Sequence, residues 1–344
     1  GLVGSEMCIR DSTLSCAEAL AWQTQRAFLR RQYRGGSGRG AWHLLRADGR
    51  DHHRKRLPLL FQDDKGVGVA IYRRRFTVLG CASSPGVPRI NGDWGACDPD
   101  NPKNRRTRAA FMVEQIGPDG GKTTVVIDTG PDFREQMIAA KVEAIDAVLY
   151  THAHADHLHG IDDLRIYFAL QKSRVPIYAD PITMARIRDG FAYCLETPAG
   201  SNYPPIVRPY LIADINEPVV IDGAGGPIAF GVHMQQHGDV HSLGFRIGDV
   251  AYCTDVSDFP AESLPKLAGL EVLVIDALQY RYHPSHLSLE QALGWIETLA
   301  PKRAILTHMH IPLDYETVMH ETPDHVEPAY DQMRFEIEID LEAA

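Results

Sequence analysis

Short apolar runs rich in β-branched residues recur from residue 75 onward, separated by polar or glycine-containing segments. Such runs, bounded by turn-forming residues, predict β-strands. Eight runs of this kind are present: 75–80, 109–116, 123–130, 144–152, 230–237, 243–255, 271–277 and 303–308. Within the run 243–255, Gly248 and Asp249 predict a hairpin turn between two strand segments.

Three longer segments carry apolar residues at helical spacing: 160–172, 181–195 and 288–300. In the third, Ser288 followed by Glu290 and Gln291 is typical of a helix N-terminus, and Pro301 stops the helix. These helices and strands alternate without forming a regular series of β-α-β units. The sequence therefore predicts a mixed α/β (α+β) fold with several antiparallel strands.

Polar residues that can carry chemistry stand where the predicted strands end. Asp128, Asp255, Asp276 and His308 each close an apolar run, and a histidine cluster begins at His152, where another run ends. In α/β proteins, strand ends and the loops that follow them hold the functional residues. We therefore expect one functional site at these strand ends.

Charge is unevenly distributed along the chain, whose formal net charge is −10. Residues 1–75 hold 15 Lys and Arg against 7 Asp and Glu, whereas residues 76–344 carry a balance of −18. This change of sign predicts a leader, 1–75, that is disordered or foreign to the protein, and a single domain, 76–344. Residues 1–12 resemble translated adapter sequence. The alternative is that the leader is a basic arm that binds nucleic acid.

The composition excludes several classes of protein. A content of 44% hydrophobic and 23% charged residues is typical of a globular chain rather than a disordered one. No apolar stretch approaches the ~20 residues that a membrane-spanning helix needs. The six cysteines are far apart and form no CxxC pair, which argues against a disulfide framework and against a thiolate zinc site. We therefore expect a reducing, cytoplasmic location.

The segment THAHADHLHG (151–160) is the strongest chemical signal. Its His152, His154, Asp156 and His157 offer imidazole and carboxylate groups, which borderline divalent metals prefer as ligands. Alternate side chains on an extended backbone point the same way, so His152 and His154 can bind one ion. Asp156 and His157, beyond a change in backbone direction, can bind a second. The alternative is a histidine-rich loop exposed to solvent.

This segment resembles the signature of the metallo-β-lactamase-fold hydrolases, and the resemblance extends over residues 76–344. It implies a four-layer αβ/βα sandwich with the active site between the edges of two sheets. It also implies that Asp128 supports the site from behind the metal ligands. One Zn or Mn ion would be bound by His152, His154 and His237. A second would be bound by Asp156, His157 and His308, and Asp255 would bridge the two ions. Asp156 and Asp255 would also be catalytic residues.

Residues 79–108, with HADHLHGIDDLR and HPSHLSLEQAL, resemble the PhnP-like phosphoribosyl 1,2-cyclic phosphodiesterases and, more distantly, the tRNA 3′-processing nucleases. This resemblance implies that His286 is the general acid that protonates the leaving oxygen, with His283 as the alternative. Some proteins of this branch hold an extra zinc with a cysteine cluster and a later histidine. Here Cys97 stands without a cysteine cluster around it and Ile311 stands at the later position, so we expect no structural zinc.

Two features favour a small substrate. Only 18 residues separate His237 from Asp255, whereas the tRNA nucleases insert a long arm between the corresponding motifs. The acidic balance of residues 76–344 would also repel a polyanion. His241, close to His237 in sequence, is expected to line the pocket or support the site. Three arginines are candidates to hold phosphate groups, or else to pair with carboxylates of the domain: Arg105, Arg106 and Arg108.

The predicted activity is that of a dinuclear metal-dependent phosphodiesterase, a hydrolase acting on a small cyclic phosphate or nucleotide-like ester. Two cations that share a solvent molecule lower its pKa, so that hydroxide forms near neutral pH and attacks phosphorus. One alternative is an RNase Z-like or exonuclease-type nuclease acting on RNA or DNA ends. Another is a lactonase, a thioesterase or a non-catalytic cofactor-biosynthesis protein of the same fold. The expected partner is thus a small phosphodiester rather than nucleic acid or a membrane, and a homodimer is left open.

Overall fold

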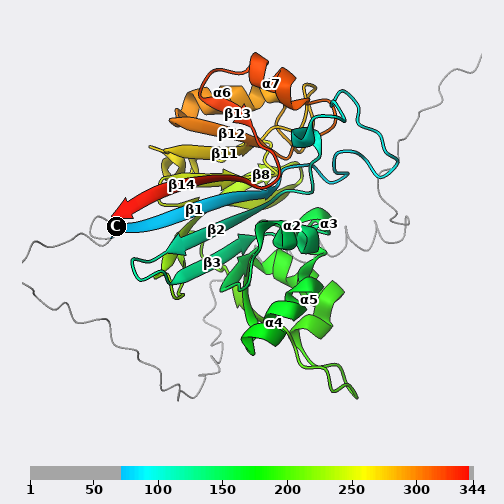
Figure 1. Cartoon of the computed structure of the whole chain (residues 1–344), viewed down its shortest axis with the longest axis vertical. Helices are drawn as coiled ribbons and strands as arrows, with labels where there is room; N and C mark the ends of the chain where they lie inside the picture. Colours follow the sequence, from blue (N-terminus) through cyan, green and yellow to red (C-terminus); the bar gives the residue numbers. More distant parts are fainter. Residues whose placement is uncertain (1–70, 341–344) are drawn as a thin grey trace, which may run out of the picture. The chain divides into compact units, whose positions relative to one another are not determined.

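A computed structural model describes residues 71–340. The predicted leader, 1–75, lies outside this range except for its last five residues, so its interpretation stays a prediction. The described residues form two seven-stranded sheets with helices on the outer face of each (Figure 1). No helix within 71–340 is long and apolar enough to cross a bilayer.

The first sheet is antiparallel at one end and parallel at the other. Strands β14, β1, β2 and β3 pair antiparallel, whereas β3, β4, β5 and β6 pair parallel. In spatial order the strands are β14 (Met333–Asp340), β1 (Ile71–Gly80), β2 (Ala110–Ile116), β3 (Lys122–Ile127), β4 (Ala147–Leu149), β5 (Val175–Ala179) and β6 (Val207–Leu211).

The second sheet has the same division. Strands β13, β12, β11 and β10 pair parallel, and β10, β9, β8 and β7 pair antiparallel. The predicted turn at Gly248 and Asp249 joins β9 to β10, so the run 243–255 forms parts of two strands. The spatial order is β13 (Val326–Pro328), β12 (Arg303–Thr307), β11 (Val272–Asp276), β10 (Val250–Cys253), β9 (Val240–Ile247), β8 (Ile228–His237) and β7 (Val219–Ile221).

Alternate residues of the central strands belong to two different cores. On β2, Phe111 and Val113 belong to the larger core, whereas Ala110 and Met112 belong to the smaller one. The ring of Phe111 stacks on Tyr252 of β10 with centroids 4.7 Å apart, so the larger core joins the two sheets. Because both faces of such a strand are buried, nearly every position is apolar, which explains the continuous apolar runs in the sequence.

Helices complete the outer layers (Figure 1). The smaller core lies between the first sheet and its helices and includes Phe133 and Ile187. The larger core continues beneath the helices of the second sheet, where it includes Ile296 and Val318. The predicted four-layer αβ/βα sandwich is therefore confirmed. The first sheet carries α2 (Phe133–Ala140), α3 (Ala155–Leu158), the 3₁₀ turn η2 (Ile161–Leu164), α4 (Arg165–Gln171) and α5 (Pro181–Leu195), and the second carries α6 (Leu289–Leu299) and α7 (Tyr315–Glu321).

The three predicted helices are present with one change. The segment 181–195 forms α5, and 288–300 contains α6. Ser288 caps α6 by accepting a hydrogen bond from the backbone N–H of Gln291, whose side chain accepts from the Ser288 N–H in return. The segment 160–172 is not one helix, because the turn η2 precedes α4 and changes the direction of the chain.

Candidate metal centre

Six strand ends meet at facing edges of the two sheets. Strand β3 is parallel to β4, and β10, β11 and β12 are parallel to one another. Strand β8 points the same way as β10 because both are antiparallel to β9. The N–H of Leu243 on β9 donates to the carbonyl of Thr151 after β4, which ties the two edges together. At the end of each of these six strands, or up to three residues after it, lies one residue of the site. In chain order these residues are Asp128, His152, His237, Asp255, Asp276 and His308.

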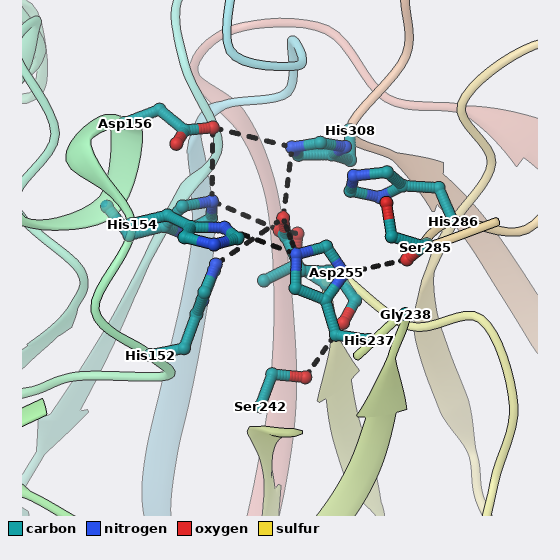
Figure 2. Close-up of polar contacts among 12 residues, drawn as sticks. His152, His154, Asp156, His237, Gly238, Ser242, Asp255, Ser285, His286 and His308 are labelled. Carbon is teal, nitrogen blue, oxygen red and sulfur yellow. Dashed lines mark hydrogen bonds and ion pairs between the residues drawn. The ribbon is translucent and has the colours of Figure 1, made fainter. Parts of the chain in front are cut away.

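The first ligand group consists of His152, His154, His237 and Asp255, whose candidate ligand atoms all lie within 4.8 Å of one another (Figure 2). His237 Nε2 is 3.2 Å from His154 Nδ1. Asp255 Oδ1 lies 3.7 Å from His152 Nε2 and 3.8 Å from His237 Nε2. Separations of this size leave room for one ion at the centre of the group.

The second ligand group consists of Asp156, His157, Asp255 and His308, again with all ligand atoms within 4.8 Å. His157 Nε2 lies 3.1 Å from Asp255 Oδ2 and 3.4 Å from Asp156 Oδ2. His308 Nε2 lies 3.4 Å from Asp255 Oδ1. Asp255 is common to both groups, so the structure brings together the two sets of residues that the family resemblance implied.

The backbone of the motif folds so that its two halves face different groups. His154 is extended and α3 begins at the next residue, which turns Asp156 and His157 away from the direction of His152. Two glycines allow the close approach that this turn needs. A Cβ on Gly130 would overlap the carbonyl oxygen of Asp156, and a Cβ on Gly160 would overlap that of Gly130.

Three residues of the site adopt left-handed backbone angles. Asp128, with φ 69°, directly follows β3, and His308, with φ 57°, directly follows β12, whereas Asp255, with φ 52°, is the second residue after β10. This region is unfavourable for residues with a Cβ, and Asp and His are among the few that enter it with some frequency. The left-handed turn redirects each side chain from the sheet into the site.

Hydrogen bonds behind the site fix which ring nitrogen of three histidines faces it. His157 Nδ1 donates to Asp128 Oδ2 at 2.7 Å, and His237 Nδ1 donates to the carbonyl of Ser285 at 2.6 Å. The Thr151 hydroxyl donates to Asp128 at 2.7 Å and therefore accepts from His152 Nδ1 at 3.0 Å. In each ring Nε2 is left to face the site, as in metal-binding histidines. Asp128 thus holds the His157 ring directly and the His152 ring through Thr151.

Burial without partners marks these nitrogens as ligand positions. Nε2 of His152, His157 and His308 is buried and has no hydrogen-bond partner within the described part of the chain. Such orphaned polar atoms are rare in native proteins unless they bind something. Burial also lowers the pKa of His152 well below its usual range, and that of His237 to about 4. Both imidazoles are therefore neutral and keep a lone pair for a metal ion.

The carboxylates of the site are ionised. Burial would raise the pKa of Asp255, but the neighbouring His157 and His308 rings outweigh it and hold the pKa well below the usual range. Burial would likewise lower the pKa of His157, but Asp255 and Asp156 outweigh it and raise the pKa well above the usual range. The two carboxylates of the second ligand group, Asp156 and Asp255, thus attract positive charge. Nitrogen and carboxylate donors in two groups of four fit two divalent ions such as Zn²⁺ or Mn²⁺.

Comparison with known families agrees with this site. The family model of the beta-lactamase superfamily domain matches residues 123–309, more than half of the chain. The chain belongs to the beta-lactamase superfamily. The matched range contains every member of both ligand groups.

Relatives place this superfamily chain near the PhnP family, as the sequence predicted. A diphosphatase from the PhnP family, known from its crystal structure, has 34% sequence identity to this chain. The two structures superpose with a TM-score of 0.70, over 79% of this chain and 100% of the diphosphatase chain. An octanoyltransferase of Porphyromonas gingivalis is 32% identical over 75% of this chain and 50% of its own length. A ribonuclease Z of Bradyrhizobium diazoefficiens is 32% identical over 42% of this chain and 45% of its own length. The chain thus spans about half the length of these two curated relatives.

His286 lies beside both ligand groups of this beta-lactamase superfamily chain (Figure 2). Its ring stacks on His308 with centroids 4.6 Å apart and meets the His237 ring at 4.7 Å. Burial would lower the pKa of His286, but the Asp276 carboxylate, which accepts from its Nδ1 at 2.7 Å, outweighs burial and raises the pKa to about 9. His283 lies one ring further out, 5.3 Å from His286, with Nδ1 close to Ser285. His286 is therefore the better placed of the two to hold a proton at the site.

The three candidate arginines do not form one patch. Arg106 is only 2% exposed, and its Nη2 donates to Asn104 within the loop. Arg108 donates two hydrogen bonds to the carboxylate of Asp132, which is the alternative in which an arginine pairs with a carboxylate of the domain. Arg105 is exposed. His241 is also exposed, on β9, and belongs to neither ligand group.

Several residues around the site carried no sequence signal that would single them out. Ser83 and Arg89 belong to the loop after β1 and contact the two ring nitrogens of His310, at 2.9 Å and 2.5 Å. Thr151 hydrogen-bonds Asp128, and its place directly before His152 was the one available hint. Ser and Thr are common on any surface, so such supporting contacts emerge only in three dimensions.

Proposed function

We propose that this protein is a dinuclear metal-dependent phosphodiesterase that hydrolyses a small phosphodiester, such as a cyclic phosphate or a nucleotide-like ester. One observation carries the proposal: the Asp255 carboxylate is shared by two groups of converging ligand atoms, whose residues are buried except for His154, with the acid His286 beside both. The diphosphatase of the PhnP family, whose name denotes cleavage of a phosphoric anhydride, supports phosphorus as the centre that is attacked.

The residues divide the chemistry between them. His152, His154 and His237 would hold one ion and Asp156, His157 and His308 the other, with Asp255 shared. Two bound divalent ions would supply Lewis acidity toward phosphoryl oxygens and a water molecule that ionises near neutral pH. His286 would donate its Nε2 proton to the departing ester oxygen, because its Nδ1 is engaged with Asp276. The Asp276 carboxylate would keep this imidazole protonated and fix its orientation.

The chain between His237 and Asp255 favours a small substrate over a polymer. Strand β8 ends at His237, β9 begins at Val240, and β10 ends at Cys253, so tight turns and two strands use nearly all of the intervening residues. No part of this described segment projects outward to hold a long nucleic acid. The ribonuclease Z relative keeps a nuclease as the second candidate, to be separated by experiment.

Hydrolysis of bis(p-nitrophenyl) phosphate by the purified protein tests the proposal. We expect activity that EDTA abolishes and that Zn²⁺ or Mn²⁺ restores. Parallel assays would use a short RNA, a nucleoside diphosphate ester, a lactone and an octanoyl thioester, the last because one relative is an octanoyltransferase. Activity on the lactone or thioester with none on any phosphodiester would overturn the proposal. A strong preference for RNA ends would favour the nuclease instead.

A further inference from the structure

A pocket of 680 Å³ opens beside the metal centre, between the segment that follows Asp255, the loop before α6 and one side of α6. We call it the Trp295 pocket. Its walls combine aromatic and polar side chains, among them Asp258, Tyr282, His283, Gln291 and Trp295, with Gly294 on α6. Neither the ligand groups nor the proposed acid His286 use this space.

The Trp295 pocket shares two walls with the metal centre. His283 lines the pocket, and its ring is 5.3 Å from that of His286. Ser257 also lines the pocket, and its hydroxyl accepts from the N–H of Gly238, the residue after His237. Figure 2 shows Gly238, His237 and His286 on the same side of the site. A molecule bound at the metal ions therefore has the pocket as its neighbouring space.

The pocket lining suits a planar ring. Tyr282 is 73% exposed and can lie flat against a ligand. Trp295 is half-buried and is held edge-on by Phe259, with ring centroids 5.1 Å apart at 83°. Aromatic side chains of this kind can stack on the flat face of any of the nucleobases.

The charge of the lining decides which part of a substrate belongs there. None of the described residues that line the pocket is Lys or Arg, so it offers no counter-ion for a phosphate group. Asp258 is exposed and carries a carboxylate, which accepts hydrogen bonds from the N–H groups on the edge of a base. The phosphoryl group therefore belongs at the metal ions, and an uncharged ring with N–H donors belongs in the pocket.

We propose that the Trp295 pocket binds the nucleobase of a nucleotide ester whose phosphoryl group lies at the metal centre. This inference rests on the proposed function and narrows the substrate from small phosphodiesters to nucleotide esters, because a sugar phosphate without a base would leave the pocket empty. Tyr282 and Trp295 contact the faces of the ring, and Asp258 accepts from its edge.

Gly294 offers a substitution that fills the pocket from a helix. A Cβ at this position meets no atom within 4 Å, and leucine is a better helix former than glycine, so Gly294→Leu should fold. Glu297→Leu is the matched control, since Glu297 is exposed on the same helix and is not part of the lining. Tyr282→Ala removes an exposed ring and gives a second, independent variant.

Binding is measured first, by calorimetric titration of the metal-loaded protein with GMP, AMP and ribose 5-phosphate. We expect at least one nucleotide to bind tenfold or more tightly than ribose 5-phosphate. Gly294→Leu and Tyr282→Ala should reduce that ratio, and Glu297→Leu should preserve it. Equal affinity of the wild-type protein for nucleotides and ribose 5-phosphate would overturn the inference, as would an unchanged ratio in Gly294→Leu.

Turnover separates this inference from the proposed function. Thymidine 5′-p-nitrophenyl phosphate and methyl p-nitrophenyl phosphate release the same leaving group, but only the first carries a base. We expect the kcat/KM ratio between them to exceed ten, mainly through KM, and to fall about tenfold in Gly294→Leu. Hydrolysis of both esters without preference would overturn the pocket and leave the phosphodiesterase standing. Base-dependent binding without hydrolysis of either ester would overturn the phosphodiesterase and leave the pocket.

Discussion

The Nδ1 of His286 donates a hydrogen bond of 2.7 Å to the carboxylate of Asp276, which is itself fully buried at the end of β11. The second oxygen of that carboxylate lies 3.8 Å from Nδ1 of His308. That separation is too long for a hydrogen bond, so Asp276 holds the proposed general acid by a hydrogen bond and stands beside His308 only as a nearby charge.

Replacing His286 should distinguish substrates by their leaving groups. A general acid typically contributes 10²- to 10⁴-fold when the leaving oxygen is strongly basic. We expect His286→Ala to lower kcat/KM about 100-fold or more for a methyl or ribosyl leaving group, and about tenfold or less for p-nitrophenolate, which departs without a proton. Steady-state kinetics on the two classes measures this. Equal losses on both would remove His286 as the acid, and the selective loss in His283→Ala instead would transfer the role to His283.

Asp255→Asn should remove metal ions from both ligand groups. The substitution keeps the side-chain shape and tolerates the left-handed backbone, but it removes the charge that both groups share. We expect a loss of bound metal measurable by mass spectrometry and a fall in kcat/KM of about 10³-fold or more, in line with the contribution of electrostatic stabilisation. Asp249→Asn, an exposed change of the same charge, is the control. Full metal content in Asp255→Asn would contradict the shared-ligand assignment.

Asp128→Asn should weaken the second ligand group without touching it directly. The amide would present an N–H₂ group to at least one of three donors: the Thr151 N–H, the Thr151 hydroxyl or His157 Nδ1. Loss of such a supporting contact costs roughly 10- to 100-fold in metal affinity. Competition with a chelator measures the change, and Asp132→Asn tests for a general effect of charge. An unchanged affinity would show that Asp128 only stabilises the fold.

Asp331, which belongs to neither ligand group, should make folding stability depend on pH. Burial raises its pKa to about 6, although the N–H and hydroxyl of Thr107 oppose the shift by donating to it. An unfolded aspartate titrates near pH 3.9. The folded state thus binds the proton more tightly, so the stability contributed by this group is complete below about pH 4 and is lost as the pH rises through about 6. Urea unfolding at pH 5 and pH 7.5 should show a smaller loss of stability in Asp331→Asn than in the wild-type protein. Identical losses would rule out Asp331 as the origin.

The sequence predicted those strands whose burial on both faces requires a run of apolar residues. Strands such as β2 and β12 are buried at nearly every position because both of their faces pack, and they were recognised by their apolar runs AFMV and AIL. Strands at the sheet edges or next to them were missed. Strand β14 alternates apolar and charged residues as MRFEIEID, and β5 and β6 each contain a proline, so none forms a continuous apolar run. The short helix α2 was also missed, since eight residues give little helical periodicity.

Those residues of the site that lie at the ends of strands could be predicted from the sequence. Asp128, Asp255 and His308 were identified because each follows an apolar run directly, and the family resemblance supplied the grouping that spacing alone leaves open. The hydrogen bond between Asp276 and His286 was not predictable, because the two residues are ten positions apart across a loop and no periodicity governs a loop. Burial of Arg106 was likewise hidden, since an arginine next to other arginines gives no sign of facing inward.

The left-handed angles of Asp128, Asp255 and His308 tie the directions of three side chains of the site to the packing of both sheets. Each such residue costs roughly 1 kcal/mol or more of backbone strain, which the surrounding structure must offset. A mutation that loosens either sheet would let these residues relax to ordinary backbone angles. Their side chains would then turn away from the site, although no residue of the site itself had been changed.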